Sequence, residues 1–158
     1  MVDDRDVTIT GRTAAGEILC SPARCADFAY LISIGGPAER EVAGFQNVRV
    51  RLRLTFEDAS SQADGGASRE DVERLIHFAR QIDFTKGRLL VHCQAGISRS
   101  SAAAVIALAV LGGPGRERDA VAHVRRVHPA ARPNIRMIEL ADAILEADGA
   151  LLQACQAP

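Results

Sequence analysis

Residues 87–112 restrict the fold more than any other part of the chain. Gly87–Cys93 (GRLLVHC) is an apolar run after a turn glycine, the pattern of a central strand buried on both faces. A short loop containing Gly96 follows. From Ser98 to about Leu111 the chain is alanine-rich and apolar nearly all round, which predicts a buried helix. A covered strand joined to a covered helix predicts a sheet with helices packed on it.

Three further segments have strand patterns. Residues 47–56 (NVRVRLRLTF) alternate with a period of two, which predicts an edge or half-covered strand. Residues 28–36 (FAYLISIGG) are a short apolar run ending in a glycine pair, as in a buried strand. Residues 6–19 (DVTITGRTAAGEIL) alternate weakly and predict one or two early strands, with turns at Gly11 and Gly16. The faces of the alternating segment carry Val48, Val50, Leu52 and Leu54 on one side, and Arg49, Arg51 and Arg53 on the other.

Three more helices are predicted outside the buried one. Ser68 and Asp71 have the spacing of a capping box, with Asp in place of the usual Glu or Gln, so a helix is expected to begin there. Its apolar stripe consists of Val72, Leu75, Ile76, Ala79 and Ile82. Residues 116–129 and 134–145 predict two more helices, divided by a turn at Pro129–Pro133. Strands early and helices late predict one α/β or α+β domain over residues 1–158.

Composition and charge exclude several classes of protein. The net charge of −1 argues against a nucleic-acid partner, because non-specific binding depends on summed positive charge. The longest apolar run, from Ala102, has 12 residues where a bilayer span needs about 20, so no membrane partner is expected. The N-terminus has no apolar signal segment, which favours a cytoplasmic location with reduced cysteines. Cys20, Cys25, Cys93 and Cys155 form no metal-binding pattern, so no metal is predicted.

The loop between the buried strand and the buried helix carries the chemistry. A thiol attacks as its thiolate, and a free cysteine with a pKa of about 8.5 is mostly protonated at neutral pH. The positive end of the helix dipole lies at this loop, and Gly96 permits the curvature that turns successive amides inward. Arg99 adds a guanidinium fork that matches two oxygens of a tetrahedral anion. Together these features predict that an activated Cys93 attacks phosphorus while the loop holds the phosphoryl oxygens.

Residues 92–100 (HCQAGISRS) match the H-C-x5-R-S signature of the cysteine-dependent protein tyrosine phosphatase superfamily. The chain resembles the compact dual-specificity branch, in particular small bacterial tyrosine-phosphatase-like proteins. The resemblance covers most of the chain and weakens before about residue 25. It implies a central, mostly parallel sheet of about four or five strands flanked by helices. It also implies hydrolysis of phosphomonoesters through a cysteinyl-phosphate intermediate, with no cofactor and no metal.

In that family an upstream aspartate protonates the leaving oxygen and later activates the water that hydrolyses the phosphocysteine. Asp58 lies 35 residues before Cys93, directly after the alternating strand, so the resemblance makes it the first candidate. Glu57 and Asp64 are alternatives for this role. Asp58 also fits a turn residue that begins a loop and has no catalytic role.

The resemblance implies further roles around the loop. Ser100 corresponds to the hydroxyl that hydrogen-bonds the cysteine sulfur and helps it leave, and His92 to the histidine that orders the loop and tunes the thiol. Alternatively, Ser100 bonds the backbone at the helix start and His92 is a core histidine. Pro133-Asn134 stands where dual-specificity members often carry Pro-Asn, so Asn134 either bonds the loop or caps the last predicted helix. The predicted phosphate-binding residues are Gln94, Ala95, Gly96, Ile97, Ser98 and Arg99.

The first functional hypothesis is hydrolysis of phosphotyrosine in phosphorylated proteins, with phosphoserine and phosphothreonine as further substrates. One tyrosine and no tryptophan leave no aromatic-rich recognition loop, which favours a shallow, less selective pocket. Inositol phosphates, nucleotides and other small phosphomonoesters are alternative substrates, although Gln94, Ala95 and Ile97 bring no lysine to the loop.

Two other hypotheses use the same anion loop. Rhodanese-type or arsenate-type thiol chemistry is disfavoured, because rhodanese loops are usually one residue shorter and the related arsenate reductases place their cysteine near the N-terminus. A non-catalytic phosphate reader typically lacks the cysteine or the arginine, and this chain keeps Cys93 and Arg99.

Two groups of residues have no assigned role in this scheme. Four arginines in the C-terminal helices indicate either a rim for a second anionic group or a solvated helix face. These are Arg125, Arg126, Arg132 and Arg136. Cys20 and Cys25 are candidates for trapping an oxidised Cys93, which requires that they lie close to it.

Overall fold

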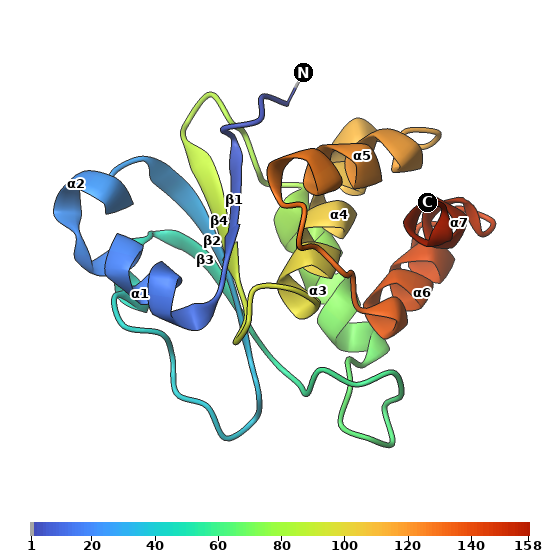
Figure 1. Cartoon of the computed structure of the whole chain (residues 1–158), viewed down its shortest axis with the longest axis horizontal. Coiled ribbons are helices and arrows are strands. Elements are labelled where there is room, and N and C mark those ends of the chain that lie inside the picture. Colours follow the sequence, from blue (N-terminus) through green and yellow to red (C-terminus); the bar gives the residue numbers. More distant parts are fainter. Residues whose placement is uncertain (1) are drawn as a thin grey trace.

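A parallel sheet of four strands forms the centre of the computed structural model, which describes residues 2–158 (Figure 1). The strand order is β1–β4–β2–β3, and all three neighbouring pairs are parallel. The carboxyl ends of all four strands therefore meet at one edge of the sheet. The strands are β1 (Val7–Thr10), β2 (Phe28–Gly35), β3 (Val50–Thr55) and β4 (Arg88–His92). This sheet confirms the predicted α/β class.

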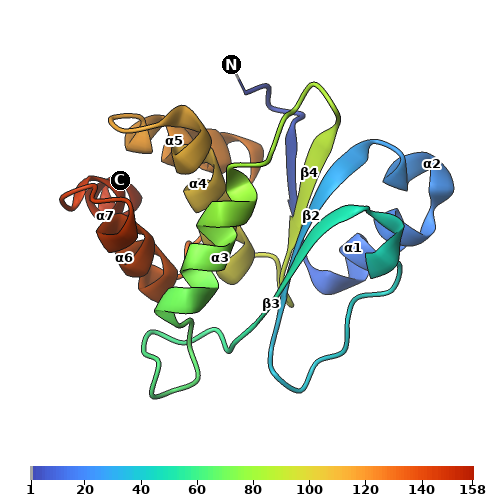
Figure 2. The same ribbon diagram turned by 180° about the vertical axis from the view of Figure 1, so that it is seen from behind.

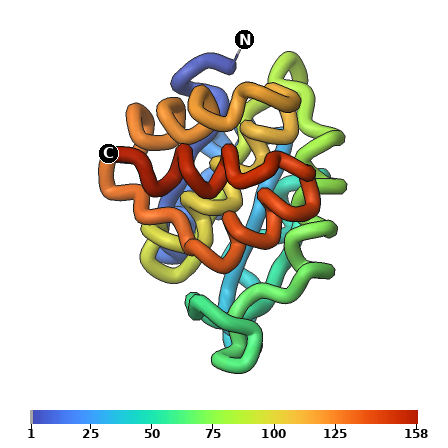
Figure 3. Tube along the Cα trace, turned by 90° about the vertical axis from the view of Figure 1, so that its right-hand side faces the viewer, coloured from blue at the N-terminus to red at the C-terminus, as the bar shows by residue number. Residues whose placement is uncertain are grey.

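Helices cover both faces of the sheet, and the larger group lies on one face (Figures 1 and 2). The smaller layer consists of α1 (Arg12–Cys20), α2 (Pro22–Cys25) and the 3-10 turn η1 (Phe45–Asn47). The larger layer consists of α3 (Arg69–Ala79), α4 (Arg99–Gly112), α5 (Glu117–Val127), α6 (Ile135–Ile144) and α7 (Ala150–Gln156). Helix α7 packs on both α5 and α6 at the outside of this layer (Figure 3).

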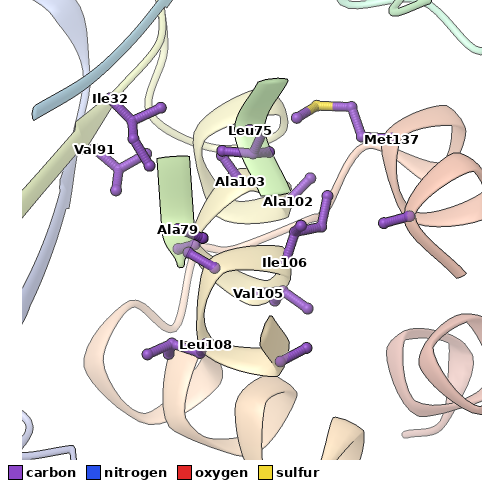
Figure 4. Packing of buried hydrophobic residues seen from close by; sticks show 14 of the residues in the cluster. Ile32, Leu75, Ala79, Val91, Ala102, Ala103, Val105, Ile106, Leu108 and Met137 are labelled. Atoms are coloured by element: carbon purple, nitrogen blue, oxygen red, sulfur yellow. The ribbon is translucent and has the colours of Figure 1, made fainter. Parts of the chain in front are cut away.

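Strand β4 and helix α4 form the buried pair that the sequence predicts. Val91 of β4 pairs with Ile9 of β1 and with Ile32 of β2, and is fully buried. Helix α4 lies between the sheet, α3 and α6, and its short alanine side chains allow these elements to pack close around it (Figure 4). The covered strand and the covered helix fix the loop between them at the carboxyl edge of the sheet.

The helix predicted after Ser68 is present with its cap. The Ser68 hydroxyl accepts a hydrogen bond from the Asp71 N–H at 3.1 Å, and the Asp71 carboxylate accepts one from the Ser68 N–H at 2.9 Å. The helices predicted over 116–129 and 134–145 correspond to α5 and α6. Aspartate therefore replaces glutamate in the capping box without loss of either bond.

Residues 12–20 correct one prediction, because they form helix α1 and not a second early strand. Ala15, Ile18 and Leu19 are its buried residues, a spacing of three and four that belongs to a helix. Gly11 precedes α1 in an extended conformation and Gly16 lies inside it, so Gly16 marks no turn. The short helices α2 and α7 were not predicted either.

Strand β3 lies at the free edge of the sheet, which confirms the edge prediction from its alternating pattern. Its apolar side chains Leu52 and Leu54 are buried, whereas Arg51 is exposed and lies over the Phe45 ring at 5.1 Å. Arg49, just before the strand, is exposed as well. The edge of the sheet therefore carries positive charge in its first half.

Candidate active site

The cysteine loop, residues 93–98, joins β4 to α4 at the carboxyl edge of the sheet. Cys93 is 2% exposed, and its Sγ lies 3.1 Å from the Ser100 hydroxyl oxygen. The Gly96 N–H donates to the same sulfur at 3.2 Å. The loop therefore curls around the thiol, and two donors are in place to stabilise a thiolate.

The carbonyl groups of the cysteine loop are held from outside. The Gln94 carbonyl accepts from the Arg12 N–H at 3.0 Å, and the Ser98 carbonyl accepts from the Asn134 N–H at 3.1 Å. The Ile97 carbonyl accepts from the Arg132 N–H at 2.9 Å. Because the C=O and N–H of a peptide point in opposite directions, these bonds turn the following N–H groups toward the inside of the loop, as in an anion-binding nest.

Gly96 has the one backbone position in the loop that requires glycine. Its φ of +75° lies in the left-handed region. A Cβ atom built on it would lie 2.4 Å from the Gly11 nitrogen and from the Thr10 carbonyl carbon, which are rigid backbone atoms. Both the φ angle and the close approach of the β1–α1 connection therefore exclude a side chain at this position.

Arg99 begins α4 with its guanidinium turned into the site. The side chain is buried, and Nη1 donates to the Phe56 carbonyl at 2.7 Å. Its buried Nε has no hydrogen-bond partner among the described residues. A buried N–H without an acceptor is costly, so this donor is suited to an anion bound in the loop.

The structure brings Asp58 to the cysteine loop. Its Oδ1 accepts from the Ser98 hydroxyl and from Asn134 Nδ2, both at 2.7 Å. The other two acids proposed for this role lie elsewhere: Asp64 accepts from Ser61 in its own turn, and Glu57 lies against Gly36. Of the three acids, Asp58 is therefore the one with a direct bond to the loop.

Asn134 both caps helix α6 and bonds the cysteine loop, the two roles that the sequence left open. Its Oδ1 accepts from the Met137 N–H at 3.0 Å and so caps α6. Its backbone N–H bonds Ser98, and its Nδ2 bonds Asp58 and, at 3.2 Å, the Ala59 carbonyl. One side chain thus connects the start of α6, the cysteine loop and the segment that carries the candidate acid.

His92 is fully buried behind the cysteine loop. Its Nδ1 lies 3.2 Å from the Cys93 carbonyl and its Nε2 lies 2.7 Å from the Ser33 hydroxyl. A carbonyl only accepts, so Nδ1 carries the proton and Nε2 accepts from Ser33. Burial lowers the pKa of His92 to about 4, although its bond to the Cys93 carbonyl acts in the opposite direction. The ring is therefore neutral at pH 7.

Ser33 and Arg53 belong to this network but were not identified from the sequence. Arg53 Nη1 donates to the Ser33 hydroxyl at 3.1 Å, which leaves the Ser33 proton for His92. The signal in the sequence was present but ambiguous. Ser33 is a polar residue in an apolar run, and Arg53 appeared as one of three equivalent arginines in an alternating strand.

The four C-terminal arginines do not form one rim around the loop. Arg125 donates to the carbonyls of Cys155 and Ala157, and Arg126 pairs with Asp4 at 2.6 Å. Of the other two, Arg136 donates to the Ala67 carbonyl, and Arg132 contacts the loop only through its backbone N–H, which donates to the Ile97 carbonyl. Two of the four thus bond the segments next to the chain ends.

Cys20 and Cys25 lie at the opposite end of the sheet from Cys93. They lie in α1 and α2, directly before β2 begins, whereas Cys93 follows the end of β4. Since β4 alone spans about 15 Å at 3.3 Å per residue, neither thiol is placed to trap an oxidised Cys93 directly. All four cysteines are free.

Residues 2–158 contain neither a cluster of metal-ligating side chains nor a helix suited to span a membrane. No three His, Cys, Asp or Glu side chains in this range gather closely enough to hold a metal ion. None of the helices within it has the length and hydropathy that crossing a bilayer requires.

No protein-family model matches the chain, and no curated protein matches its sequence. Solved structures match it over nearly its whole length. Human DUSP28 is 20% identical with a TM-score of 0.66, and the alignment covers 92% of this chain and 91% of that protein. The human tyrosine phosphatase-like serine/threonine/tyrosine-interacting protein is also 20% identical, with a TM-score of 0.69 and coverages of 92% and 94%.

A third similar structure is PTPMT1 in complex with PI(5)P, which is 15% identical with a TM-score of 0.64 and coverages of 91% and 92%. At these identities the likeness concerns the fold. The chain has the fold of the dual-specificity phosphatases and related tyrosine-phosphatase-like proteins.

Proposed function

We propose that the chain is a phosphatase of the cysteine-dependent protein tyrosine phosphatase superfamily, which hydrolyses phosphomonoesters through a cysteinyl-phosphate. The observation that supports it best is the surroundings of the Cys93 sulfur. A buried thiol accepts from the Gly96 N–H, contacts the Ser100 hydroxyl, and lies at the start of α4 beside Arg99. Inert buried cysteines have apolar surroundings, whereas this one has donors for a thiolate and for an anion.

In the first step the Cys93 thiolate attacks phosphorus and a phosphorus–sulfur bond forms. The inward N–H groups of the loop and Arg99 Nε hold the phosphoryl oxygens as their charge changes. The phosphorus–oxygen bond to the leaving group breaks, and Asp58 gives its proton to that oxygen. Oδ1 of Asp58 already accepts two hydrogen bonds, so Oδ2 is the atom that carries the proton.

In the second step water attacks the cysteinyl-phosphate and releases inorganic phosphate. Asp58, now a carboxylate, takes a proton from that water. The phosphorus–sulfur bond breaks, and the Ser100 hydroxyl donates to the departing sulfur, 3.1 Å away. Both electron pairs return to the groups that supplied them, so the cycle needs no oxidant or reductant.

Phosphotyrosine in proteins is the substrate class that we favour, with phosphoserine and phosphothreonine as further substrates. Ile97, on the cysteine loop, is a large apolar side chain that is 41% exposed, and it can contact the body of a substrate. The phosphoinositide in the PTPMT1 structure motivates a second class. Against it, Gln94 and Ala95 bring no charge for further phosphates on the inositol ring.

Hydrolysis of p-nitrophenyl phosphate and phenyl phosphate by three proteins tests the proposal. The wild type should turn over both, and Cys93→Ser should reduce turnover to background. Asp58→Asn should lower the rate with phenyl phosphate by about 10²–10⁴-fold, the usual contribution of a general acid. The loss with p-nitrophenyl phosphate should be smaller, because that leaving group needs no proton. Equal rates in all three proteins contradict the mechanism.

A substrate panel separates the two substrate classes. Phosphotyrosine, phosphoserine and phosphothreonine peptides are compared with monophosphorylated phosphoinositides by kcat/KM, with release of phosphate as the common readout. A higher kcat/KM with phosphoinositides than with any of the peptides overturns the protein-substrate assignment and leaves the phosphatase mechanism intact.

A further inference from the structure

Two imidazoles bond the carbonyls of the cysteine loop, and the second of them is His128. His128 follows the last residue of α5, and its Nε2 lies 2.7 Å from the Gly96 carbonyl oxygen. Because a carbonyl oxygen only accepts, Nε2 carries a proton and donates it. The bond joins two residues 32 positions apart and connects α5 to the middle of the loop.

The Gly96 carbonyl is the one whose orientation most needs a fixed partner. The carbonyls of Gln94 and Ser98 are held by backbone N–H groups, which any residue other than proline supplies. The Gly96 carbonyl is held by a side chain instead, and glycine leaves the peptide that follows it freer to rotate than any other residue does. The identity of residue 128 therefore decides how the Gly96–Ile97 peptide is oriented.

Orientation of this peptide fixes one of the anion donors. The Gly96 C=O and the Ile97 N–H belong to the same planar unit and point in opposite directions. With the carbonyl held outward by His128, the Ile97 N–H points the opposite way, toward the inside of the loop. Without that bond the peptide can turn, and the loop loses a donor for the phosphoryl oxygens.

The backbone of His128 is itself held in place. Its N–H donates to the Val124 carbonyl at 2.8 Å, and its carbonyl accepts from the Ala131 N–H at 2.9 Å. Pro129 follows directly and restricts the conformation of His128 further. The imidazole is half-buried between α5 and the loop. A side chain anchored in this way can hold a loop peptide in one orientation.

We propose that His128 is a positioning residue for the phosphatase reaction: its Nε2–H holds the Gly96 carbonyl outward so that the Ile97 N–H faces the phosphoryl group. His128 itself does not touch the substrate. The inference rests on the proposed function, because the reaction gives the Ile97 N–H its task.

Three substitutions at one position test the hydrogen bond apart from the space that the ring fills. His128→Gln keeps an N–H donor the same number of bonds from Cα as Nε2. His128→Asn supplies the same amide one bond shorter, and His128→Leu supplies no donor. His77, an exposed histidine on α3, provides the matched control His77→Leu.

We expect kcat/KM with p-nitrophenyl phosphate to fall about 10–100-fold in His128→Leu and His128→Asn. Loss of a whole oxyanion donor costs about 10²–10³-fold, and here the donor is misdirected but not deleted. His128→Gln should recover most of the loss, and His77→Leu should match the wild type. The affinity for tungstate, a tetrahedral anion, should fall in the same order, as should the rate of Cys93 alkylation by iodoacetate near neutral pH.

Thermal unfolding of each variant separates positioning from a merely structural role. A variant that is fully folded at the assay temperature and still loses kcat/KM and tungstate affinity supports positioning. Wild-type kcat/KM and tungstate affinity in His128→Leu overturn the inference, as does a loss in His128→Gln as large as that in His128→Leu. If the wild type hydrolyses no phosphomonoester, the proposed function fails, and tungstate affinity across the variants still decides the role of His128.

Discussion

His92 and His128 bond the same loop from different sides, and burial of the His92 ring decides how that residue responds to pH. His92 lies in the core, where its Nε2 accepts from Ser33 and its Nδ1 donates to the Cys93 carbonyl. Protonation of Nε2 removes the acceptor that Ser33 needs and places a charge in an apolar region. The neutral ring is thus part of what keeps the start of the cysteine loop in place.

The unfolding free energy should therefore fall as the pH falls from about 6.5 to about 4. His92 has a pKa of about 4 in the folded chain, below its ordinary value of 6.5, so the unfolded chain binds the proton first. Stability from this group is present above pH 6.5 and is lost below it, by about 2 kcal/mol between pH 7 and pH 5. Urea unfolding at a series of pH values measures this loss.

The control for this prediction is His92→Gln, which has no group that titrates in this range. Its unfolding free energy should be lower at pH 7 because hydrogen bonds are lost, but it should change less between pH 7 and pH 5 than that of the wild type. Carboxylates contribute equally to both proteins. The difference between the two slopes of unfolding free energy against pH therefore isolates the contribution of His92. Identical slopes contradict the assignment.

At the scale of the elements, helix α6 and the segment after β3 meet through Asn134. The side chain caps α6 through Oδ1 and holds Asp58 through Nδ2. Two substitutions separate these tasks. Asn134→Asp keeps an acceptor for the Met137 N–H but removes the donor and adds a charge beside Asp58, whereas Asn134→Ala removes both bonds.

We expect Asn134→Asp to unfold near the wild-type temperature and Asn134→Ala to lose about 1 kcal/mol, the usual value of an N-cap. Both should lower kcat with phenyl phosphate roughly tenfold or more, because a displaced Asp58 delivers its proton poorly. The loss with p-nitrophenyl phosphate should be smaller. Differential scanning fluorimetry and steady-state rates give both quantities. A wild-type rate with phenyl phosphate in Asn134→Asp contradicts the role given to this contact.

The elements that the sequence predicts well are those whose pattern is strong within one segment. β4 and α4 are continuous and apolar, β3 alternates, and α3 begins with a capping box. Helix α1 is hard to predict because it has nine residues, follows Gly11, which supplies no side-chain cap, and contains Gly16. Residues 6–19 alternate weakly throughout, although the strand ends at Thr10 and the helix begins at Arg12.

The same distinction applies to the site. Cys93, Gly96, Arg99 and Ser100 lie within eight consecutive positions, so one motif predicts them together. Ser33 and His128 lie 59 and 32 positions from their partners in the loop network, and their contacts exist only after the sheet and helices have packed. No spacing rule within a segment predicts contacts of this kind.

At the scale of the whole molecule, the site draws on three of the four connections that leave the carboxyl edge of the sheet. Arg12 follows β1, the segment from Phe56 to Asp58 follows β3, and the cysteine loop follows β4. Parallel strands bring these ends together, as in other open α/β sheets that bind ligands at this edge. Anion binding should consequently stabilise the fold as a whole.

Sodium tungstate at about a hundred times its Kd should raise the unfolding free energy by about 2.7 kcal/mol. For a chain of this size that corresponds to a rise in Tm of about 5–10 °C. The rise should be absent in Arg99→Ala, which lacks the free Nε donor, and absent in wild type with sodium chloride at the same ionic strength. An equal rise in Arg99→Ala places tungstate outside the cysteine loop.

The exposed arginines at the free edge of β3 have a consequence for the behaviour of the protein at high concentration. An open strand edge invites a second copy to continue the sheet, which is the first step toward fibrous aggregates. Two copies that approach through this edge bring Arg49 and Arg51 of both chains together. Mutual repulsion between these cations opposes such stacking, so the alternating pattern of β3 also protects the molecule from self-association.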